Sequence, residues 1–218
     1  MDNINILIHR MEAQKDPQTA KAMSSYMRDQ FPFLGIKTPQ RREMVKEFLK
    51  LYPPEKEWIS ILWDLPEREY QYTALDILLK MRKTLEPKDL TLIESFILNR
   101  SWWDTVDLLA SNAAGFLLHN APHLQVEFGE KWIHSDNLWL NRTAILFQLH
   151  YKQDTDEALL YRYILAHADS PEFFLQKAIG WALREYSKTN PNSVIDFIGK
   201  EDLKPLSIRE GLKWIRKS

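Results

Sequence analysis

The residues best suited to chemistry lie in the segment Ser101-Trp-Trp-Asp-Thr-Val-Asp107, which brings two tryptophans and two aspartates together. On a helix, Trp103 and Asp107 lie one turn apart, so an indole and a carboxylate share one face. Both groups stabilise positive charge, the carboxylate by direct electrostatics and the indole through its π face. No cation lies three or four residues from Asp107 within this helix. A solvated aspartate beside a half-buried tryptophan is therefore at least as good an interpretation.

The start of the same segment has the spacing of a helix cap. Ser101 and Asp104 match a capping box, in which the hydroxyl meets the N3 amide and the carboxylate reaches back. We therefore assign Asp104 a structural role in starting the helix. The apolar stripe of that helix is formed by Trp102, Val106, Leu109 and Ala113.

A second aromatic residue stands apart from the apolar face of its helix, in residues 172–186. The stripe there is formed by Leu175, Ile179, Ala182 and Tyr186. Trp181 projects away from this stripe, near Lys177 and Arg184. It either packs against a neighbouring repeat or forms a nucleic-acid surface, where an aromatic ring meets a sugar or base and cations meet phosphates. The sequence does not choose between the two.

Arg142 is unusual because its helix is apolar on nearly every side. A buried guanidinium needs an anion. That anion is a protein carboxylate, such as Asp107 or Asp104, or a phosphate of a ligand. An internal ion pair is the more common arrangement.

Positive charge gathers near the two ends of the chain, although the net charge is −1. Exposed helix N-termini bind phosphate readily, and charge runs usually mark solvated faces. Any nucleic-acid surface therefore has to be a local patch. The candidate DNA contacts at the N-terminal end are Lys37, Thr38, Arg41 and Arg42, around a helix start at Thr38-Pro39. Those at the C-terminal end include Arg209 and Lys213, next to Ser207 and Glu210, which have the spacing of a second capping box.

Composition excludes several classes of site. The 218 residues include no cysteine, and the six histidines form no pair at helical ligand spacing. We therefore expect no thiolate metal site, no iron–sulfur cluster and no catalytic zinc. The N-terminus does not resemble a signal peptide, and no apolar run approaches the roughly 20 residues of a membrane span. The expectation is a cytoplasmic protein with no membrane partner.

The elements that position these residues are helices. Six glycines and the absence of Asn-Gly and Asp-Gly turns argue against a β fold. Ala74, Ala110, Ala144 and Ala178 recur at intervals of 36, 34 and 34 residues within similar helical segments. A weak period of this size is typical of an α-solenoid. We predict an all-α, α-α superhelix of HEAT-like repeats with a concave face, forming one domain over residues 1–218.

The chain as a whole resembles the AlkD-type DNA alkylation repair glycosylases. The matching stretches are Phe33-Leu-Gly-Ile-Lys-Thr-Pro39 with Arg41-Arg42, Leu62-Trp-Asp-Leu-Pro-Glu-Arg-Glu69, Ser101 to Asp107, Lys131 to Gln148, and Gln176 to Tyr186. They follow one another in the same order over nearly the whole length. The resemblance implies a HEAT-like repeat protein that binds double-stranded DNA in a concave basic groove and needs no cofactor.

The resemblance also implies residue roles. Asp107 is similar to the catalytic carboxylate of these enzymes, with Trp103 and Trp181 as aromatic walls beside the lesion and Tyr26 as a further aromatic contact. Arg142 is similar to a residue that holds the DNA backbone. The implied activity is that of a monomeric, monofunctional glycosylase releasing purines alkylated at N3 or N7. The alternative is a non-catalytic HEAT-repeat protein that binds DNA structure or a protein partner.

Overall fold

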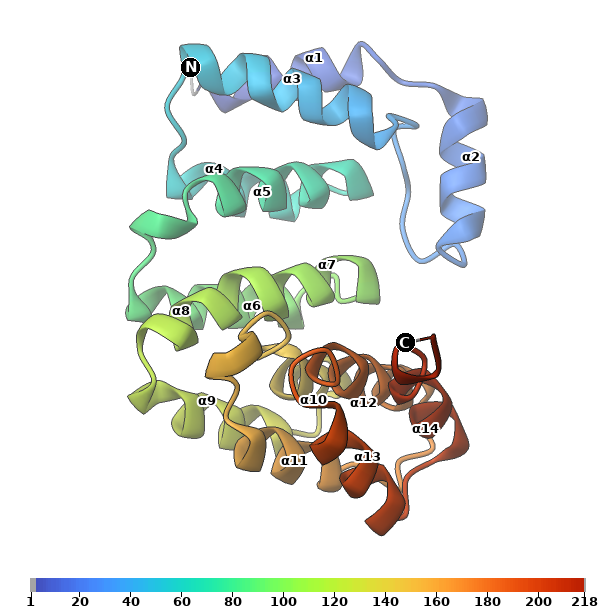
Figure 1. Cartoon of the computed structure of the whole chain (residues 1–218). Helices are drawn as coiled ribbons and strands as arrows, with labels where there is room; N and C mark the ends of the chain where they lie inside the picture. Colours follow the sequence, from blue (N-terminus) through green and yellow to red (C-terminus); the bar gives the residue numbers. More distant parts are fainter. Residues whose placement is uncertain (1–2, 218) are drawn as a thin grey trace. The chain divides into compact units, whose positions relative to one another are not determined.

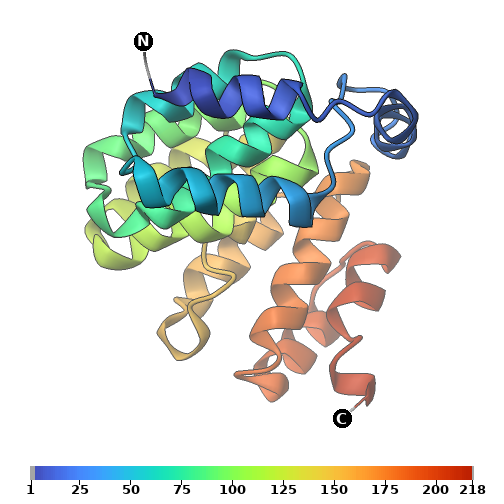
Figure 2. The ribbon, with the colours of Figure 1, turned by 90° about the horizontal axis from the view of Figure 1, so that it is seen from above.

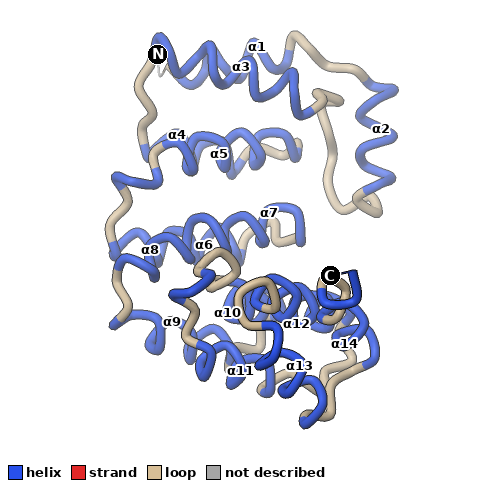
Figure 3. Tube along the Cα trace, in the orientation of Figure 1, coloured by secondary structure: helices blue, strands red, loops and turns tan. Residues whose placement is uncertain are grey.

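All regular secondary structure in the part of the chain that the structure describes, residues 3–217, is helical. A computed structural model shows helices joined by loops and no strand within those residues (Figures 1 and 3). The prediction of an all-α fold of the α-α superhelical repeat class is confirmed. No helix among the described residues is both long enough and apolar enough to cross a membrane.

The chain divides into two compact units, Met1–Thr84 and Leu85–Ser218. The single domain over residues 1–218 therefore stays a prediction. The helices of the first unit are α1 (Ile4–Glu12), α2 (Pro17–Tyr26), α3 (Thr38–Leu51), α4 (Lys56–Asp64) and α5 (Arg68–Lys80). Those of the second are α6 (Leu90–Leu98), α7 (Trp103–Leu108), α8 (Gly115–Asn120), α9 (His123–Ile133), α10 (Leu138–Leu146), α11 (Glu157–Leu165), α12 (Phe173–Tyr186), α13 (Pro191–Lys200) and α14 (Pro205–Gly211).

Several helix starts lie where proline and a capping residue predict them. Asp16 caps α2, because its carboxylate accepts the amides of residues 18 and 19. Asn190 caps α13 through the amide of Ser193. Helix α3 begins at Thr38, with a proline in its first turn. These starts follow from local chemistry, since proline is tolerated in the first turn and the cap satisfies free amides.

The repeat period is visible in the packing. Ala74, Ala110, Ala144 and Ala178 are all buried. Side-chain amides mark the same period, because each donates to carbonyls in the turn before its own helix or at the end of the preceding helix. The donors are Gln71 in α5, Asn141 in α10 and Gln176 in α12. Their numbers differ by 70 and 35, two periods and one, so these three residues occupy equivalent positions of a 35-residue repeat.

In the first unit, a buried carboxylate organises the loop that leads into α3. Glu69 accepts the backbone amides of Leu34, Gly35 and Ile36 at 2.8–3.0 Å. Gly35 has φ of +94°, and a Cβ atom there would lie 2.1 Å from the carbonyl oxygen of Asp16. Only glycine fits this conformation. Two of the stretches that carry the resemblance are thus joined by one set of hydrogen bonds.

In the second unit, the helices that carry the candidate site pack on one another. Helix α10 contacts both α7 and α12, and α12 packs most extensively on α14. Figure 2 shows α12 and the C-terminal helices, in orange and red, gathered together. Helix α7 continues through a π-helical segment, Leu109–Ala114, into α8. Segments of this kind often occur at functional sites, and this one begins two residues after Asp107.

Candidate active site

The helix that carries Trp103 and Asp107 begins without the predicted capping box. Helix α7 starts at Trp103, Trp102 is its N-cap residue, and no side chain caps it. The Ser101 hydroxyl instead donates to the carbonyl of Ile97 at 2.6 Å, at the end of α6. The prediction for Ser101 is therefore wrong, because the preceding helix offered its hydroxyl a closer partner. The predicted apolar stripe is confirmed, because Val106, Leu109 and Ala113 are fully buried and Trp102 is half-buried.

Asp107 forms a two-pronged ion pair with Arg142. The Arg142 Nε donates to Asp107 Oδ1 at 2.7 Å, and Nη2 donates to Oδ2 at 2.9 Å. The remaining guanidinium nitrogen, Nη1, donates to the carbonyl of Phe174. Only 5% of the Arg142 side chain and 14% of the Asp107 side chain are exposed. The anion that the buried guanidinium requires is therefore Asp107.

The pairing follows from the repeat period. Asp107 in α7, Arg142 in α10 and Lys177 in α12 are separated by 35 residues each, and α10 packs against both of the other helices. Equivalent positions of adjacent repeats lie side by side, so residues far apart in sequence become neighbours. The cation that pairs with Asp107 therefore lies on a different helix, outside the three- and four-residue spacing of helical neighbours.

Burial raises the pKa of Asp107 above its ordinary value. The hydrogen bonds and positive charge of Arg142 oppose that rise by favouring the ionised form, and the nearby charge of Asp104 adds to it. A two-pronged arginine bond fits the ionised carboxylate, which accepts on both oxygens. The site thus holds a carboxylate that has little contact with solvent and whose ionised form is stabilised by Arg142.

An open pocket of about 500 Å³ brings the predicted residues of the second unit together. Its lining consists of Trp103, Asp107, Arg142, Phe173, Phe174, Lys177, Trp181, Arg184, Glu210 and Lys213. Trp103, Asp107 and Trp181 therefore line the same pocket, and this arrangement favours a functional site over simple core packing. Trp181 is partly exposed and lines this pocket.

A cluster of aromatic rings supports the pocket wall. Trp102 and Trp139 each lie within 5.1 Å of the Phe174 ring, measured between ring centroids, and 5.7 Å from one another. One of these pairs is edge-to-face and two are tilted, and aromatic contacts at such distances are favourable. Trp102 thus packs as predicted, which leaves Trp103 as the member of the tryptophan pair that lines the pocket.

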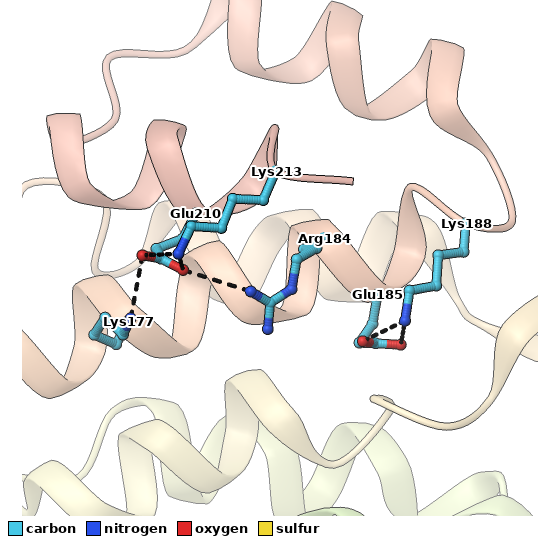
Figure 4. A network of polar contacts seen from close by, with 6 residues as sticks. All are labelled: Lys177, Arg184, Glu185, Lys188, Glu210 and Lys213. Carbon is cyan, nitrogen blue, oxygen red and sulfur yellow. Dashed lines mark hydrogen bonds and ion pairs between the residues drawn. The ribbon is translucent and has the colours of Figure 1, made fainter. Parts of the chain in front are cut away.

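The cationic side of the pocket is organised around one carboxylate (Figure 4). The Lys213 ammonium donates to both carboxylate oxygens of Glu210 at 2.7 Å each, the shortest contacts in the cluster. Lys177 lies 3.2 Å and Arg184 3.5 Å from its oxygens. The capping box predicted for Ser207 and Glu210 is wrong, because Ser207 donates to the carbonyl of Gln176. Arg209 is exposed and is not part of the pocket lining.

The candidate DNA contacts of the first unit differ in accessibility. Tyr26 is 74% exposed, and Lys37 and Thr38 lie exposed at the start of α3. Arg42 is exposed and lies 3.5 Å from Asp76. Arg41 is buried, donates to Asp76 at 3.1 Å and covers the ring of Tyr72. Its guanidinium is committed to the interior, and we therefore remove Arg41 from the set of proposed DNA contacts.

Sequence reasoning missed three residues of the pocket. Phe173 and Phe174 stand at the start of α12, where the capping and apolar patterns carry no sign of a site. For Glu210, its spacing from Ser207 predicts a helix cap and not a pocket residue. One signal was available, since Glu210 is an acidic residue three positions before Lys213 in an otherwise basic segment.

The chain as a whole is similar to known proteins. It matches the DNA alkylation repair enzyme family over residues 7–215. A solved structure described as "Predicted DNA alkylation repair enzyme from Enterococcus faecalis" is 36% identical, with a TM-score of 0.86 over 94% of this chain and 98% of that one. No protein of curated function matches the chain. With the family match spanning nearly the whole sequence and the fold shared over the same length, the chain belongs to the DNA alkylation repair enzyme family.

Proposed function

We propose that this protein is a monofunctional DNA glycosylase that releases purines alkylated at N3 or N7 from duplex DNA. The observation that carries the proposal is the pocket in which Asp107, Trp103 and Trp181 lie together beside cationic side chains. Membership of the family gives a role in DNA repair. The residues of the pocket add a means of stabilising positive charge, which is what this reaction requires.

The substrate supplies much of the driving force. Alkylation at N3 or N7 makes the purine cationic, so the base leaves as a neutral molecule and needs no general acid. When the bond between C1′ and the purine nitrogen breaks, its electron pair goes to the base and positive charge develops on the sugar. A water oxygen then bonds to C1′ and releases a proton. The protein must therefore stabilise a cation and orient a water molecule.

In this proposal Asp107 and the two indoles perform those tasks. The Asp107 carboxylate stabilises the sugar cation, and each indole face adds about 0.5–2 kcal/mol of cation–π attraction. An ionised carboxylate has about four lone-pair sites. Arg142 takes one on each oxygen, which leaves sites on both oxygens to accept a hydrogen bond from the attacking water.

We assign Arg142 as a positioning residue in this mechanism. Its two bonds fix the orientation of the Asp107 carboxylate and keep it ionised in a buried setting. Its third contact, to the carbonyl of Phe174, ties this pair to the aromatic wall. The resemblance implies a different role for Arg142, in holding the DNA backbone, and the two roles predict different effects on folding stability.

A base-release assay on duplex DNA carrying N7-methylguanine and N3-methyladenine tests the proposal. Asp107→Asn should slow release by on the order of 10²-fold or more, because an oriented electrostatic contact is lost. Asp104→Asn is the matched control, since Asp104 lies on the same helix but not in the pocket lining. It should retain activity at neutral pH.

Other outcomes would decide against the proposal. If Asp107→Asn releases base as fast as the wild type, the assigned mechanism is wrong. Salt-dependent DNA binding without any base release by the wild type would indicate a non-catalytic DNA-binding protein. Absence of DNA binding altogether would indicate a scaffold for a protein partner.

A further inference from the structure

Glu210 is a buried carboxylate in contact with three cations that line the pocket. Its side chain is 7% exposed, whereas Lys177, Arg184 and Lys213 are 38%, 30% and 47% exposed. The cations come from two elements, α12 and the turn that follows α14, and they converge on the two oxygens of one carboxylate (Figure 4). The Glu210 carboxylate is thus buried in the pocket wall, and the three cations lie between it and the solvent.

The position of Glu210 is fixed by the packing of α14 on α12. A Cβ atom added to Gly180 would lie 2.4 Å from the Cβ of Glu210 and 3.0 Å from the carbonyl of Ser207. The two helices therefore approach as closely as a glycine allows. The Ser207 hydroxyl adds a hydrogen bond to α12 at the carbonyl of Gln176. Glu210 has little freedom to swing out toward the pocket.

The charge balance leaves this cluster short of anions. Three cations and one carboxylate sum to +2. An ammonium has three N–H donors and a guanidinium five, and Glu210 accepts from only a part of them. Lysine and arginine side chains so close together repel one another unless an anion lies among them. Glu210 supplies that anion on the buried side of the cluster. Donors of the three cations remain available on the solvent side for a second anion.

We propose that Glu210 is a positioning residue that holds Lys177, Arg184 and Lys213 together as one binding site for a single DNA backbone phosphate at the edge of the pocket. The identity of the anion rests on the proposed function. The proposal goes beyond the assignment of three separate DNA contacts, because it makes the cations a unit and gives the buried carboxylate the task of assembling it. Glu210 does not touch the reacting atoms.

The test is the binding of undamaged duplex DNA, measured by fluorescence anisotropy over a range of salt concentrations. Glu210→Gln keeps the shape of the side chain and removes its charge. We expect weaker binding, with a salt dependence whose slope is smaller by about 1, because the cations no longer act on the phosphate together. Because undamaged DNA is used, a protein without glycosylase activity would still give a valid result.

Glu185→Gln is the matched control. Glu185 lies on α12 like Lys177 and Arg184, pairs with Lys188 at 2.7 Å and does not line the pocket of Asp107 (Figure 4). Its loss raises the net charge by the same amount, so binding should stay unchanged or tighten slightly. A purely structural Glu210 would behave in the same way once the protein is folded. Glu210→Gln binding as tightly as Glu185→Gln, or tighter, would overturn the proposal.

A second pair of variants keeps the proposal testable if Glu210→Gln does not fold. Lys177→Ala and Lys213→Ala should each reduce the salt slope by about 1, and the double variant should reduce it by little more. That non-additivity is the mark of one shared phosphate. A slope reduced by about 2 in the double variant would mean two independent phosphates, and an unchanged slope would mean none. Either result would contradict the proposal.

Discussion

Replacing Arg142 by methionine tests how the protein maintains an ionised carboxylate in a buried pocket. Methionine has a similar length and fits apolar surroundings, but it removes both hydrogen bonds to Asp107 and the bond to the Phe174 carbonyl. Because the pair is only 5% and 14% exposed, solvent replaces little of what is lost. Asp107 is left as a buried carboxyl group with no cation in contact.

The size of the effect follows from burial. Removing one partner of a buried ion pair costs about 3–5 kcal/mol of folding free energy, and the unpaired carbonyl adds roughly 1 kcal/mol. We expect Arg142→Met to lower the free energy of unfolding by at least about 3 kcal/mol at neutral pH. Adding Asp107→Asn should restore a large part of this loss, since the buried charge is then gone.

The loss of unfolding free energy in Arg142→Met should also depend on pH and should be greater at higher pH. Without Arg142, the pKa of Asp107 rises further above its value in the unfolded chain, because burial is then unopposed. The folded variant holds a proton that the unfolded chain has released, so its stability falls as pH rises through the folded-state pKa. The difference from wild type is therefore largest at neutral pH and shrinks as the pH approaches the ordinary range of aspartate.

Urea denaturation of the wild type, both single variants and the double variant, at neutral and acidic pH, measures these quantities. A cost below about 1 kcal/mol, typical of exposed pairs, or strictly additive single and double variants, would refute the reasoning. A residue that only contacts the DNA backbone gives a different result. It would leave folding stability near wild type and reduce the salt slope of DNA binding by about 1.

Two further predictions concern the active carboxylate and the fold. Burial raises the pKa of Asp107, and the proposed mechanism uses its ionised form, so the rate of base release should fall on acidification at a higher pH than an ordinary aspartate would give. Asp104→Asn should shift this fall in rate to lower pH, because the Asp104 charge contributes to the raised pKa of Asp107. A wild-type rate that falls only in the ordinary range of aspartate, together with no shift in Asp104→Asn, would contradict this prediction. Gly35→Ala should destabilise the protein by about 2 kcal/mol or more in urea denaturation, since φ of +94° and a 2.1 Å approach to Asp16 both oppose a side chain. Gly199→Ala, where a Cβ atom meets nothing within 4 Å, is its control and should be neutral or slightly stabilising; equal effects of the two would show that the backbone strain at position 35 is not felt.

Much of the local structure could be predicted from sequence because its causes are local. Proline and a neighbouring cap place the starts of α2 and α13 whatever else surrounds them. The recurring alanines revealed the repeat, since small residues are required where inner helices pack. The shared face of Trp103 and Asp107 follows from helical geometry alone.

The partners of the charged residues were decided by the tertiary structure. Arg142 had several possible anions, and the packing of α7 on α10 selected Asp107, 35 residues away. Arg41 and Arg42 are adjacent and chemically identical, yet one is buried against Asp76 and the other is exposed. Sequence spacing cannot separate such cases, because ion pairs depend on which helix faces which.

The same reason explains the two failed capping boxes. Ser101 and Glu210 each have the correct local spacing, but a capping bond competes with every other partner that folding brings near. For Ser101 that partner is a carbonyl at the end of α6, and for Glu210 it is a group of three cations. The sequence by itself determined the helices, their period and the pairing of an indole with a carboxylate on one face. Only the tertiary structure decided that the carboxylate is held by Arg142 and that a buried glutamate gathers the cations beside it, because both depend on contacts between helices that are distant in the chain.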